Sequence, residues 1–273
     1  MSKSGAGQVR GMAQSIPQEN AGEKTKDIVR FDPHQRLQHI LMMSSFVVLA
    51  LTGLPLKFAD LSLSQWWIGF WGGIEVTRTI HRLAAWVMVF DCIYHLAYLI
   101  NNIVIKRRPF PIWIIPQPKD VFDFFLEVRY YMGLTQEKPR FDRFNFHQKF
   151  DYWAIFWGIP VMAGSGFILM YPVFFAKFLP GGIIPVALVA HSDEAVLAVA
   201  WIVVVHFFFA HLAPNVFPIN WTIFTGRMSR ERYNEEHPLD YQRVLAQEAR
   251  QAAPPPAQKL PKGGPGSARK PPR

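Results

Sequence analysis

The sequence contains a single cysteine, Cys92, among its 273 residues. One thiol cannot form an intramolecular disulfide, hold an iron–sulfur cluster or a cysteine-rich zinc site, or attach a c-type haem, which needs two cysteines and a histidine. The first 30 residues also lack the apolar core of a cleavable signal peptide. Histidine is the remaining common metal-binding residue type, and the chain has nine.

Charge is missing from four long stretches of a chain that is 50% hydrophobic. The stretches are 37–56, 83–105 (interrupted only by Asp91), 152–176 and 195–224, and we expect the last to stop being helical at Ala213, before Pro214. A helix rises about 1.5 Å per residue, so about 20 apolar residues cross a hydrocarbon core of ~30 Å. The sequence therefore predicts an all-α integral membrane protein, a bundle of four transmembrane helices.

The basic residues are divided unevenly between the segments that flank these spans. Six Lys and Arg lie in residues 1–36, nine in 106–149 and ten from residue 214 onward, whereas 57–82 carries three and the loop after the third span only Lys177. This split of 25 against 4 predicts that both termini are cytoplasmic, in a bacterial inner membrane. The net charge of +9 is thus a topology signal, and we expect lipid and not nucleic acid around the protein.

The segments outside the spans suggest three regions. We expect a flexible cytoplasmic extension over 1–30, a four-helix membrane domain over 31–243, and a disordered Pro/Gly/Lys-rich tail over 244–273. Within 106–149, residues 121–131 are amphipathic and predict either a short helix at the membrane interface or an ordinary loop helix.

Five histidines in or beside the spans form two layers. His95 follows His81 by 14 residues, about 21 Å along a helix and about 40° around it, while His206 follows His191 by 15, about 22.5 Å and roughly 60°. The outer layer has His81 and His191. The inner layer has His39, His95 and His206. Ionisable side chains are expensive in a bilayer, and imidazoles on facing helices are common axial ligands of haem iron.

Other polar residues lie beside these histidines. Asp91 is one turn before His95 and could hydrogen-bond an imidazole or relay protons. Arg78 and Arg82 bracket His81, and Arg36 precedes His39; these arginines either pair with haem propionates or extend to the interface. His211, about 140° around the helix from His206, should face elsewhere.

Several motifs carry a resemblance to a known family. Arg36-Leu-Gln-His39 with 49–55, Arg78-Thr-Ile-His81-Arg82, Asn145-Phe-His-Gln-Lys149, and 225–229 with His237-Pro238 resemble the membrane cytochrome b (gamma) subunit of respiratory formate dehydrogenase. The order and spacing of these motifs cover about residues 31–243. The region is similar to bacterial cytochrome b561-like proteins, and di-haem cytochromes b paired with multihaem c-type cytochromes look closer still around His95 and 215–221.

The resemblance implies two haem b groups. It assigns His81 and His191 to the outer haem and His39 and His206 to the inner one, although His95 with His206 is an alternative. The sequence departs from the formate dehydrogenase type in having His95 and in spacing His191 and His206 by 15 residues instead of 14. The resemblance also implies a site for menaquinone or ubiquinone near the inner haem, at Asn145, His147 and Gln148; these residues could instead cap a helix.

The sequence therefore suggests a membrane subunit that carries electrons between the quinone pool and a partner. The partner would be a periplasmic-side or membrane redox subunit, such as a multihaem cytochrome c or an iron–sulfur protein. Apart from quinone chemistry, catalysis would belong to that partner, because the chain has no cluster or nucleotide motif. The alternative is a haem-free anchor or a proton or metal transporter that uses the membrane histidines and Asp91.

Overall fold

The computed structural model describes residues 27–213 and 216–253, and four long helices dominate it. These are α1 (Pro33–Lys57), α3 (Ile74–Ile100), α5 (Phe146–Met170) and α7 (Ile183–Trp201). Helix α3 continues as a π-helix, η1 (Asn101–Ile105), and α7 as two, η3 (Ile202–His206) and η4 (Phe208–Leu212). Each of the four has the length and apolar composition to cross a membrane. The predicted fold class is confirmed.

The boundaries of the spans differ from the predicted ones. The four spans are Pro33–Lys57, Ile74–Ile105, Phe146–Met170 and Ile183–Leu212. The fourth therefore begins twelve residues before the predicted 195, because two acidic residues taken as its edge lie within the helix. Asp193 pairs with Lys57 of α1 at 2.5 Å, and the Glu194 side chain lies close to Gly158 of α5. The predicted helical limit at Ala213 agrees with the end of η4 at Leu212.

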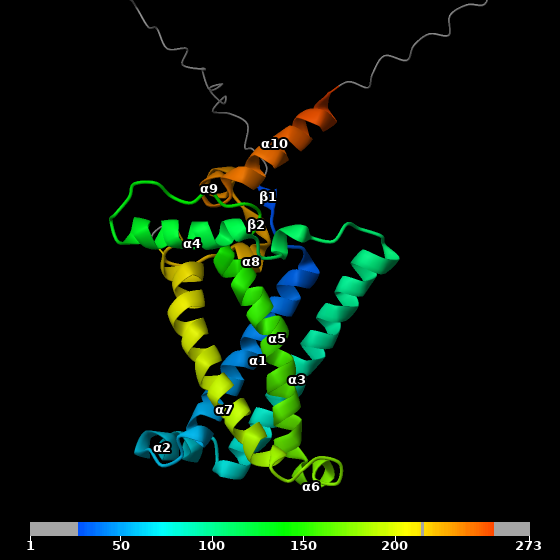
Figure 1. Cartoon of the computed structure of the whole chain (residues 1–273), viewed down its shortest axis with the longest axis vertical. Helices are drawn as coiled ribbons and strands as arrows, with labels where there is room; N and C mark the ends of the chain where they lie inside the picture. The colour runs from blue at the N-terminus through cyan, green and yellow to red at the C-terminus, as the bar shows by residue number, and fades with distance from the viewer. Residues whose placement is uncertain (1–26, 214–215, 254–273) are drawn as a thin grey trace, which may run out of the picture.

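The shorter elements gather at the two ends of the bundle (Figure 1). One end carries α2 (Ser62–Phe70) and α6 (Pro172–Phe175). The other carries β1 (Ile28–Val29), η2 (Ile112–Ile114), α4 (Pro118–Tyr131), α8 (Thr222–Thr225), β2 (Arg227–Met228), α9 (Arg230–Glu236) and α10 (Pro238–Ala252). We call the first the outer end and the second the inner end, after the membrane sides that the Lys and Arg distribution predicts. The described parts of the three Lys/Arg-rich segments all lie at the inner end.

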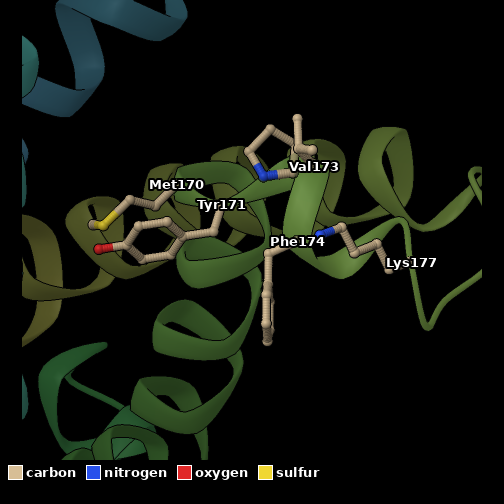
Figure 2. A pocket seen from close by; sticks show the side chains of 6 residues that line it. Met170, Tyr171, Val173, Phe174 and Lys177 are labelled. Carbon is tan, nitrogen blue, oxygen red and sulfur yellow. The ribbon is translucent and has the colours of Figure 1, made fainter.

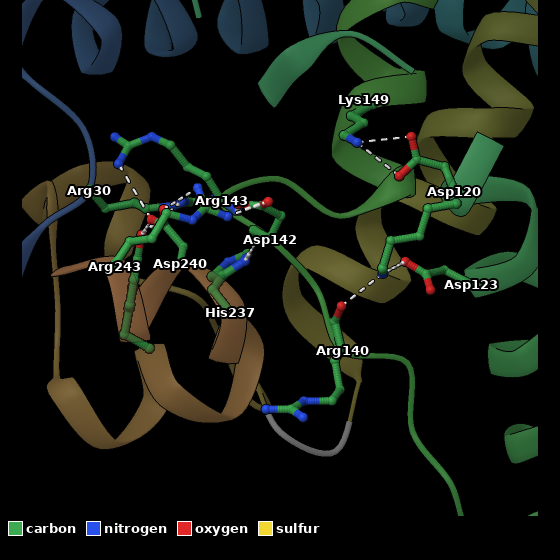
Figure 3. A network of polar contacts seen from close by, with 12 residues as sticks. Arg30, Asp120, Asp123, Arg140, Asp142, Arg143, Lys149, His237, Asp240 and Arg243 are labelled. Atoms are coloured by element: carbon green, nitrogen blue, oxygen red, sulfur yellow. Dashed lines mark hydrogen bonds and ion pairs between the residues drawn. The ribbon is translucent and has the colours of Figure 1, made fainter. Parts of the chain in front are cut away.

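Helix α4 lies across the inner ends of the spans (Figure 1), which agrees with an interfacial helix over 121–131. Buried ion pairing fastens it to α5. Lys149 of α5 contacts both carboxylate oxygens of Asp120 at 2.8 Å, and Lys119 pairs with Asp123 and donates to the Arg140 carbonyl (Figure 3). These contacts hold α4 at the start of the third span.

Regular secondary structure extends past residues 31 and 243, the predicted limits of the membrane domain. Strand β1 pairs antiparallel with β2, with Ile28 opposite Met228, and the adjacent Arg30 is buried. At the other boundary, α10 continues to Ala252, because Arg243 pairs with Asp142 and Asp240 (Figure 3). The remainder of the predicted flexible segments, 1–26 and 254–273, lies outside the described residues.

A seam of small and polar residues joins α1 to α3. Three buried residues, Gln38, Ser45 and Thr52, recur every seven positions along α1, and each contacts α3. Gln38 meets His95, the Ser45 hydroxyl donates to the Met88 sulfur, and Thr52 meets His81. A seven-residue repeat keeps one stripe of a helix against its neighbour. Small and hydroxyl side chains allow close packing between helices in a membrane, so this seam fixes the positions of both α3 histidines.

Candidate functional site

The outer histidines face each other across the bundle. His81 projects from α3 and His191 from α7, with ring centres 6.3 Å apart and ring planes inclined at 75°. His191 lies eight residues into α7 and not before the fourth span, because the helix begins earlier than the predicted residue 195. The structure thus brings the two predicted outer-layer residues together.

A hydroxyl group orients each outer imidazole. Thr52 Oγ1 lies 2.9 Å from His81 Nδ1, and Ser165 Oγ lies 3.1 Å from His191 Nδ1, which is also 3.0 Å from the Met162 carbonyl. Each hydroxyl donates its own proton to a carbonyl one turn earlier in its helix, at 2.7 Å. It must therefore accept from the imidazole, so Nδ1 carries the proton in both rings. The Nε2 lone pairs remain for a metal.

A glycine follows each of these hydroxyl residues and lies against the same imidazole. A Cβ built on Gly53 would come within 3.0 Å of His81 Cε1, and one on Gly166 within 3.1 Å of His191 Cε1. A Cβ on Gly164, two residues before Gly166 on α5, would meet nothing within 4 Å. Gly53 and Gly166 are thus required for close approach to the outer rings, and Gly164 is not.

The inner pair consists of His39 from α1 and His206 from η3, with ring centres 6.5 Å apart and planes inclined at 31°. His206 Nδ1 lies 2.8 Å from Asp151 Oδ2, and the other oxygen of Asp151 accepts from Trp201 Nε1 at 2.7 Å. The carboxylate therefore orients His206 through Nδ1. His39 Nδ1 is buried and has no hydrogen-bond partner in the described structure.

The spacing of both pairs suits a shared metal ion. A histidine nitrogen lies about 2 Å from a bound metal and about 1 Å from its own ring centre, so two opposed imidazoles have centres about 6 Å apart. The observed separations are 6.3 and 6.5 Å. Within the described ranges, no three His, Cys, Asp or Glu side chains gather around one point. Each centre would therefore have two protein ligands.

The π-helix η3 explains how a spacing of 15 residues brings His206 into position. In a regular α-helix, 15 residues would turn His206 about 60° from the direction of His191. A π turn takes up one additional residue, and η3 spans Ile202–His206, directly before the ring is placed. The fourth span thus presents His191 and His206 as a 14-residue spacing would, and His206 faces His39.

His95 is not part of the inner pair. Its Nδ1 lies 3.0 Å from Gln38 Oε1 and its Nε2 3.3 Å from the Tyr152 hydroxyl. Because the amide oxygen only accepts, Nδ1 donates to Gln38 and Nε2 accepts from Tyr152. Both ring nitrogens are thus engaged, on α1 and α5 respectively.

The three arginines considered for propionate binding lie in different surroundings. Arg36 donates to the backbone carbonyls of Phe224 and Thr225 at 2.9 and 3.2 Å, so it holds the α8 turn. Arg78 pairs with Glu75 at 2.9 Å on the surface of α3. Arg82 is exposed at the same outer end. Arg36 therefore has a structural role here, while Arg78 and Arg82 remain at the outer surface.

An aromatic cavity of about 290 Å³ lies at the inner end, between α4, α5 and α7. His147 faces it, with Nε2 2.6 Å from Glu127 Oε2 of α4 and its ring stacked on Phe209 at 3.7 Å. The wall also contains Trp201, whose indole donates to Asp151, the carboxylate that orients His206. The other lining residues are Phe124, Val128, Tyr131, Phe146 and Val205.

Asn145 and Gln148 do not line this cavity. The Asn145 side chain accepts from the Gln148 amide at 2.9 Å and Gln148 Oε1 accepts from the Asn145 amide at 3.3 Å, forming a capping box at the start of α5. Gln148 also accepts from the buried Arg30 at 3.3 Å. Of the three residues proposed from the resemblance, only His147 faces the cavity, and the other two cap the helix.

A second hollow, of about 400 Å³, lies at the outer end around α6. Figure 2 shows Tyr171 and Lys177 pointing to opposite sides of Phe174. Its walls contain no histidine or acidic residue. It therefore lacks the proton-exchanging side chains of the inner cavity.

Several functional residues were not predicted from the sequence. Asp151 directly precedes the charge-free stretch 152–176 and therefore lies outside the predicted span. An acidic residue at the edge of a span is a sequence signal for an ionisable partner inside the bundle, which here is His206. Glu127 belongs to the amphipathic stretch 121–131, where a carboxylate is expected to face water. Instead it is buried against His147. His211 lies five residues beyond His206, where it accepts from the Asn220 amide.

Four membrane-spanning helices with facing histidine pairs are typical of a membrane haem protein. A family model described as prokaryotic cytochrome b561 matches residues 30–226, which include all four spans and every residue of both pairs. The chain belongs to the prokaryotic cytochrome b561 family. Among curated proteins, none matches the chain. The cytochrome b561-like part of the resemblance is thereby confirmed.

Membership of this family makes the chain a multi-pass membrane protein that binds haem b and transfers electrons. The residues present suit that group. Both outer imidazoles keep Nε2 free, Gly53 and Gly166 leave room beside the rings, and His39 has a buried Nδ1 without a partner in the described structure.

Proposed function

We propose that the chain is a di-haem cytochrome b of the formate dehydrogenase gamma-subunit type, which links a quinone to a partner redox protein. His81 and His191 would hold the outer haem, and His39 and His206 the inner one. Bound haem supplies one-electron redox chemistry at each position. The carrying observation is the equivalent separation of the two ring pairs, 6.3 and 6.5 Å, with the fourth span contributing one histidine to each pair.

His39 is favoured over His95 as the inner ligand by the hydrogen bonds of the two rings. His95 uses both nitrogens in contacts with Gln38 and Tyr152. His39 lies opposite His206 and its Nδ1 has no partner in the described structure. Asp151 would keep the His206 Nδ1 proton in place and increase the basicity of the ligand. Arg78 and Arg82 would meet the propionates of the outer haem.

The inner cavity would bind the quinone. Its aromatic walls suit a flat apolar ring, and the Glu127–His147 pair can give or take the proton that accompanies each electron. Reduction of a quinone to a quinol takes two electrons and two protons; oxidation releases them. Trp201 joins the cavity wall to Asp151 and so to His206. Asn145 and Gln148 would act indirectly, by fixing the first turn of α5 on which His147 lies. The site suits either menaquinone or ubiquinone.

The partner would bind at the outer end and supply or accept electrons there. With the inner end in the cytoplasm of a bacterium, as the 25-to-4 division of Lys and Arg suggests, that partner would be a periplasmic-side or membrane subunit. A multihaem cytochrome c or an iron–sulfur protein has the appropriate chemistry. Electrons exchanged at one face and a quinone at the other would couple turnover to the membrane potential.

Purified protein tests this function directly. We expect a reduced-minus-oxidised spectrum with a b-type α-band and two haems per chain, and reduction of both by a soluble quinol analogue. Absence of the α-band would favour the haem-free anchor or transporter, and one haem per chain would contradict the two-pair assignment.

Glu127→Gln tests the quinone site, with the exposed Glu137→Gln as the matched control. We expect quinol-driven haem reduction to slow by about 100-fold or more in Glu127→Gln, the usual range for loss of a general base, while reduction by dithionite stays normal. Equal quinol rates in both variants would place the quinone elsewhere.

A further inference from the structure

The α1–α3 seam contains two polar atoms that the haem and quinone assignments leave without a use. Asp91 is 5% exposed and Gln38 7% exposed, and in the described structure Asp91 Oδ1 and Gln38 Nε2 are buried without hydrogen-bond partners. A carboxylate in this position is expensive in a membrane unless it is protonated or paired. A proton is therefore the simplest species that Asp91 would take up.

A three-helix contact links the next turn of α3 after this acid to the neighbours of the inner histidine pair. His95, one turn from Asp91 on α3, binds Gln38 of α1 and Tyr152 of α5. Gln38 directly precedes His39, and Tyr152 directly follows Asp151, which holds His206. The seam thus lies next to both helices that support the inner pair.

Charge then links Asp91 to electron transfer. An electron that reaches the inner haem adds a negative charge in a medium where charges interact strongly over several ångströms. We propose that Asp91 is a redox-linked proton site: when the inner haem iron gains an electron, the Asp91 carboxylate gains a proton from the inner side and becomes neutral. Oxidation of the iron returns both. This inference rests on the proposed inner haem but not on the quinone cavity.

The neighbouring helices offer few other groups that could play this part. On α3 the titratable neighbours are Cys92, Tyr94 and His95, and α5 contributes Tyr152. Helix α2, which also packs on α3, contains no Asp, Glu, Lys, Arg or His. Helix α1 carries His34, Arg36 and His39 along its inner half; Arg36 is held by the α8 carbonyls.

Hydroxyl groups extend from this region to the inner surface. His34 Nδ1 lies 2.6 Å from the Tyr94 hydroxyl, and the Tyr98 hydroxyl donates to Asp32 at 2.6 Å. Both tyrosines lie on α3, and Asp32 is the cap of α1. They provide groups through which a proton could enter the seam from water.

A redox titration of the full-length protein at several pH values tests the proposal. We expect the midpoint potential of the inner haem, identified as the component lost in His39→Ala, to fall as pH rises. The limiting slope is about 59 mV per pH unit, the value for a tenfold change in a one-electron equilibrium. Asp91→Asn should flatten this slope and Asp91→Glu should restore it, with the haem content unchanged.

Asp193→Asn is the matched control, because Asp193 lies in a membrane helix near the outer pair and should leave the slope of the inner haem unaltered. An unchanged slope in Asp91→Asn with both haems present would overturn the proton site alone. A wild-type protein that contains fewer than two haems per chain would overturn the proposed function instead. If Asp91→Asn fails to assemble, Asp91→Glu decides: a plot of potential against pH that is displaced along the pH axis relative to Asp193→Asn supports the site, and a plot that superimposes on it, or a pH-independent wild-type potential, contradicts it.

Discussion

The outer and inner histidine pairs have nearly equal separations but different surroundings. Each outer imidazole rests on a hydroxyl and a glycine from the neighbouring helix, Thr52–Gly53 or Ser165–Gly166. At the inner pair, a carboxylate orients His206, and a π-helix and an aromatic cavity lie beside it. The outer end therefore suits electron passage with little else, whereas the inner end contains the groups needed to exchange protons.

The polar and charged residues at the ends of the spans also differ between the inner and the outer end. The inner end contains a dense buried network in which Tyr233 donates to Asp240 and His237 Nδ1 donates to the Asp142 carbonyl. Burial and then the charge of Arg30 lower the pKa of His237 to about 3, so this imidazole is neutral near pH 7. At the outer end, Lys57 pairs with a largely exposed Asp193. Among the residues that the structure describes, the dense polar layer thus lies at the end that holds the aromatic cavity.

Substituting single histidines should have the largest effect, because each substitution removes one of the two proposed haem sites. We expect His81→Ala or His191→Ala to remove one haem and His39→Ala or His206→Ala to remove the other, leaving one haem per chain in each case. His95→Ala should retain both, because its nitrogens bind Gln38 and Tyr152. Haem content and the two midpoint potentials measure the outcome. A haem lost in His95→Ala but kept in His39→Ala would reverse the inner assignment.

Filling one glycine should disturb only the outer pair. Gly166→Val would push a side chain into His191, whose Cε1 lies 3.1 Å from an added Cβ, so we expect loss or weakening of the outer haem. Gly164→Val, two residues away on α5, adds the same volume where nothing lies within 4 Å and should retain two haems. Equal haem contents in the two variants would show that close approach at Gly166 is unimportant.

Shortening and lengthening the fourth span by one residue should have different effects on the inner pair. Deleting Val204 within η3 lets the π turn become a regular α turn, so His206 keeps its direction and two haems should remain. Inserting an alanine after Val204 adds a further residue and turns His206 about 100° away. We expect the inner haem to be lost only in the insertion, as judged from haem content. Loss in the deletion instead would mean that the π turn is itself required.

Breaking one ion pair at each end should show how much each end contributes to the stability of the protein. Lys149→Met removes the buried cation and leaves the half-buried Asp120 without its charged partner; it should lower the free energy of unfolding by about 3 kcal/mol, the lower end of the usual effect of breaking a buried pair. Lys57→Met releases an exposed Asp193 into solvent and should have little effect. Denaturation in detergent measures both. Equal destabilisation would contradict a more rigid inner end.

Hydropathy, charge and histidine spacing predicted most of this architecture. The four charge-free stretches identified the spans, and the two-layer arrangement brought His81 to His191 and included His39 with His206. What failed depended on contacts between distant residues. The fourth span is predicted to begin only at residue 195 because the pairing of Asp193 with Lys57 is not visible in a linear sequence. The sequence does not single out Glu127 because its burial against His147 arises only after α4 folds over α5.

The spacing of 15 between His191 and His206 illustrates the same limit. Helical geometry alone places His206 in the inner layer but roughly 60° around the helix from His191, since a π turn has no composition that distinguishes it from the surrounding apolar helix. The choice between His39 and His95 also depended on side-chain partners. His95 lies 14 residues after His81 on the same helix and nearly on the same face, which favours it in the sequence. In the structure, however, Gln38 and Tyr152 occupy both of its ring nitrogens.

The π turn in η3 has a consequence for comparing this chain with its relatives. Insertions are usually sought in loops, where evolution tolerates them most readily. Here a one-residue difference in length can lie within a membrane helix and leave the directions of the two proposed haem-binding histidines unchanged. An alignment that moves such a gap into a neighbouring loop would pair His206 with the wrong residue. Homologous histidines in this span are therefore best matched by the direction in which they project, not by counting along the chain.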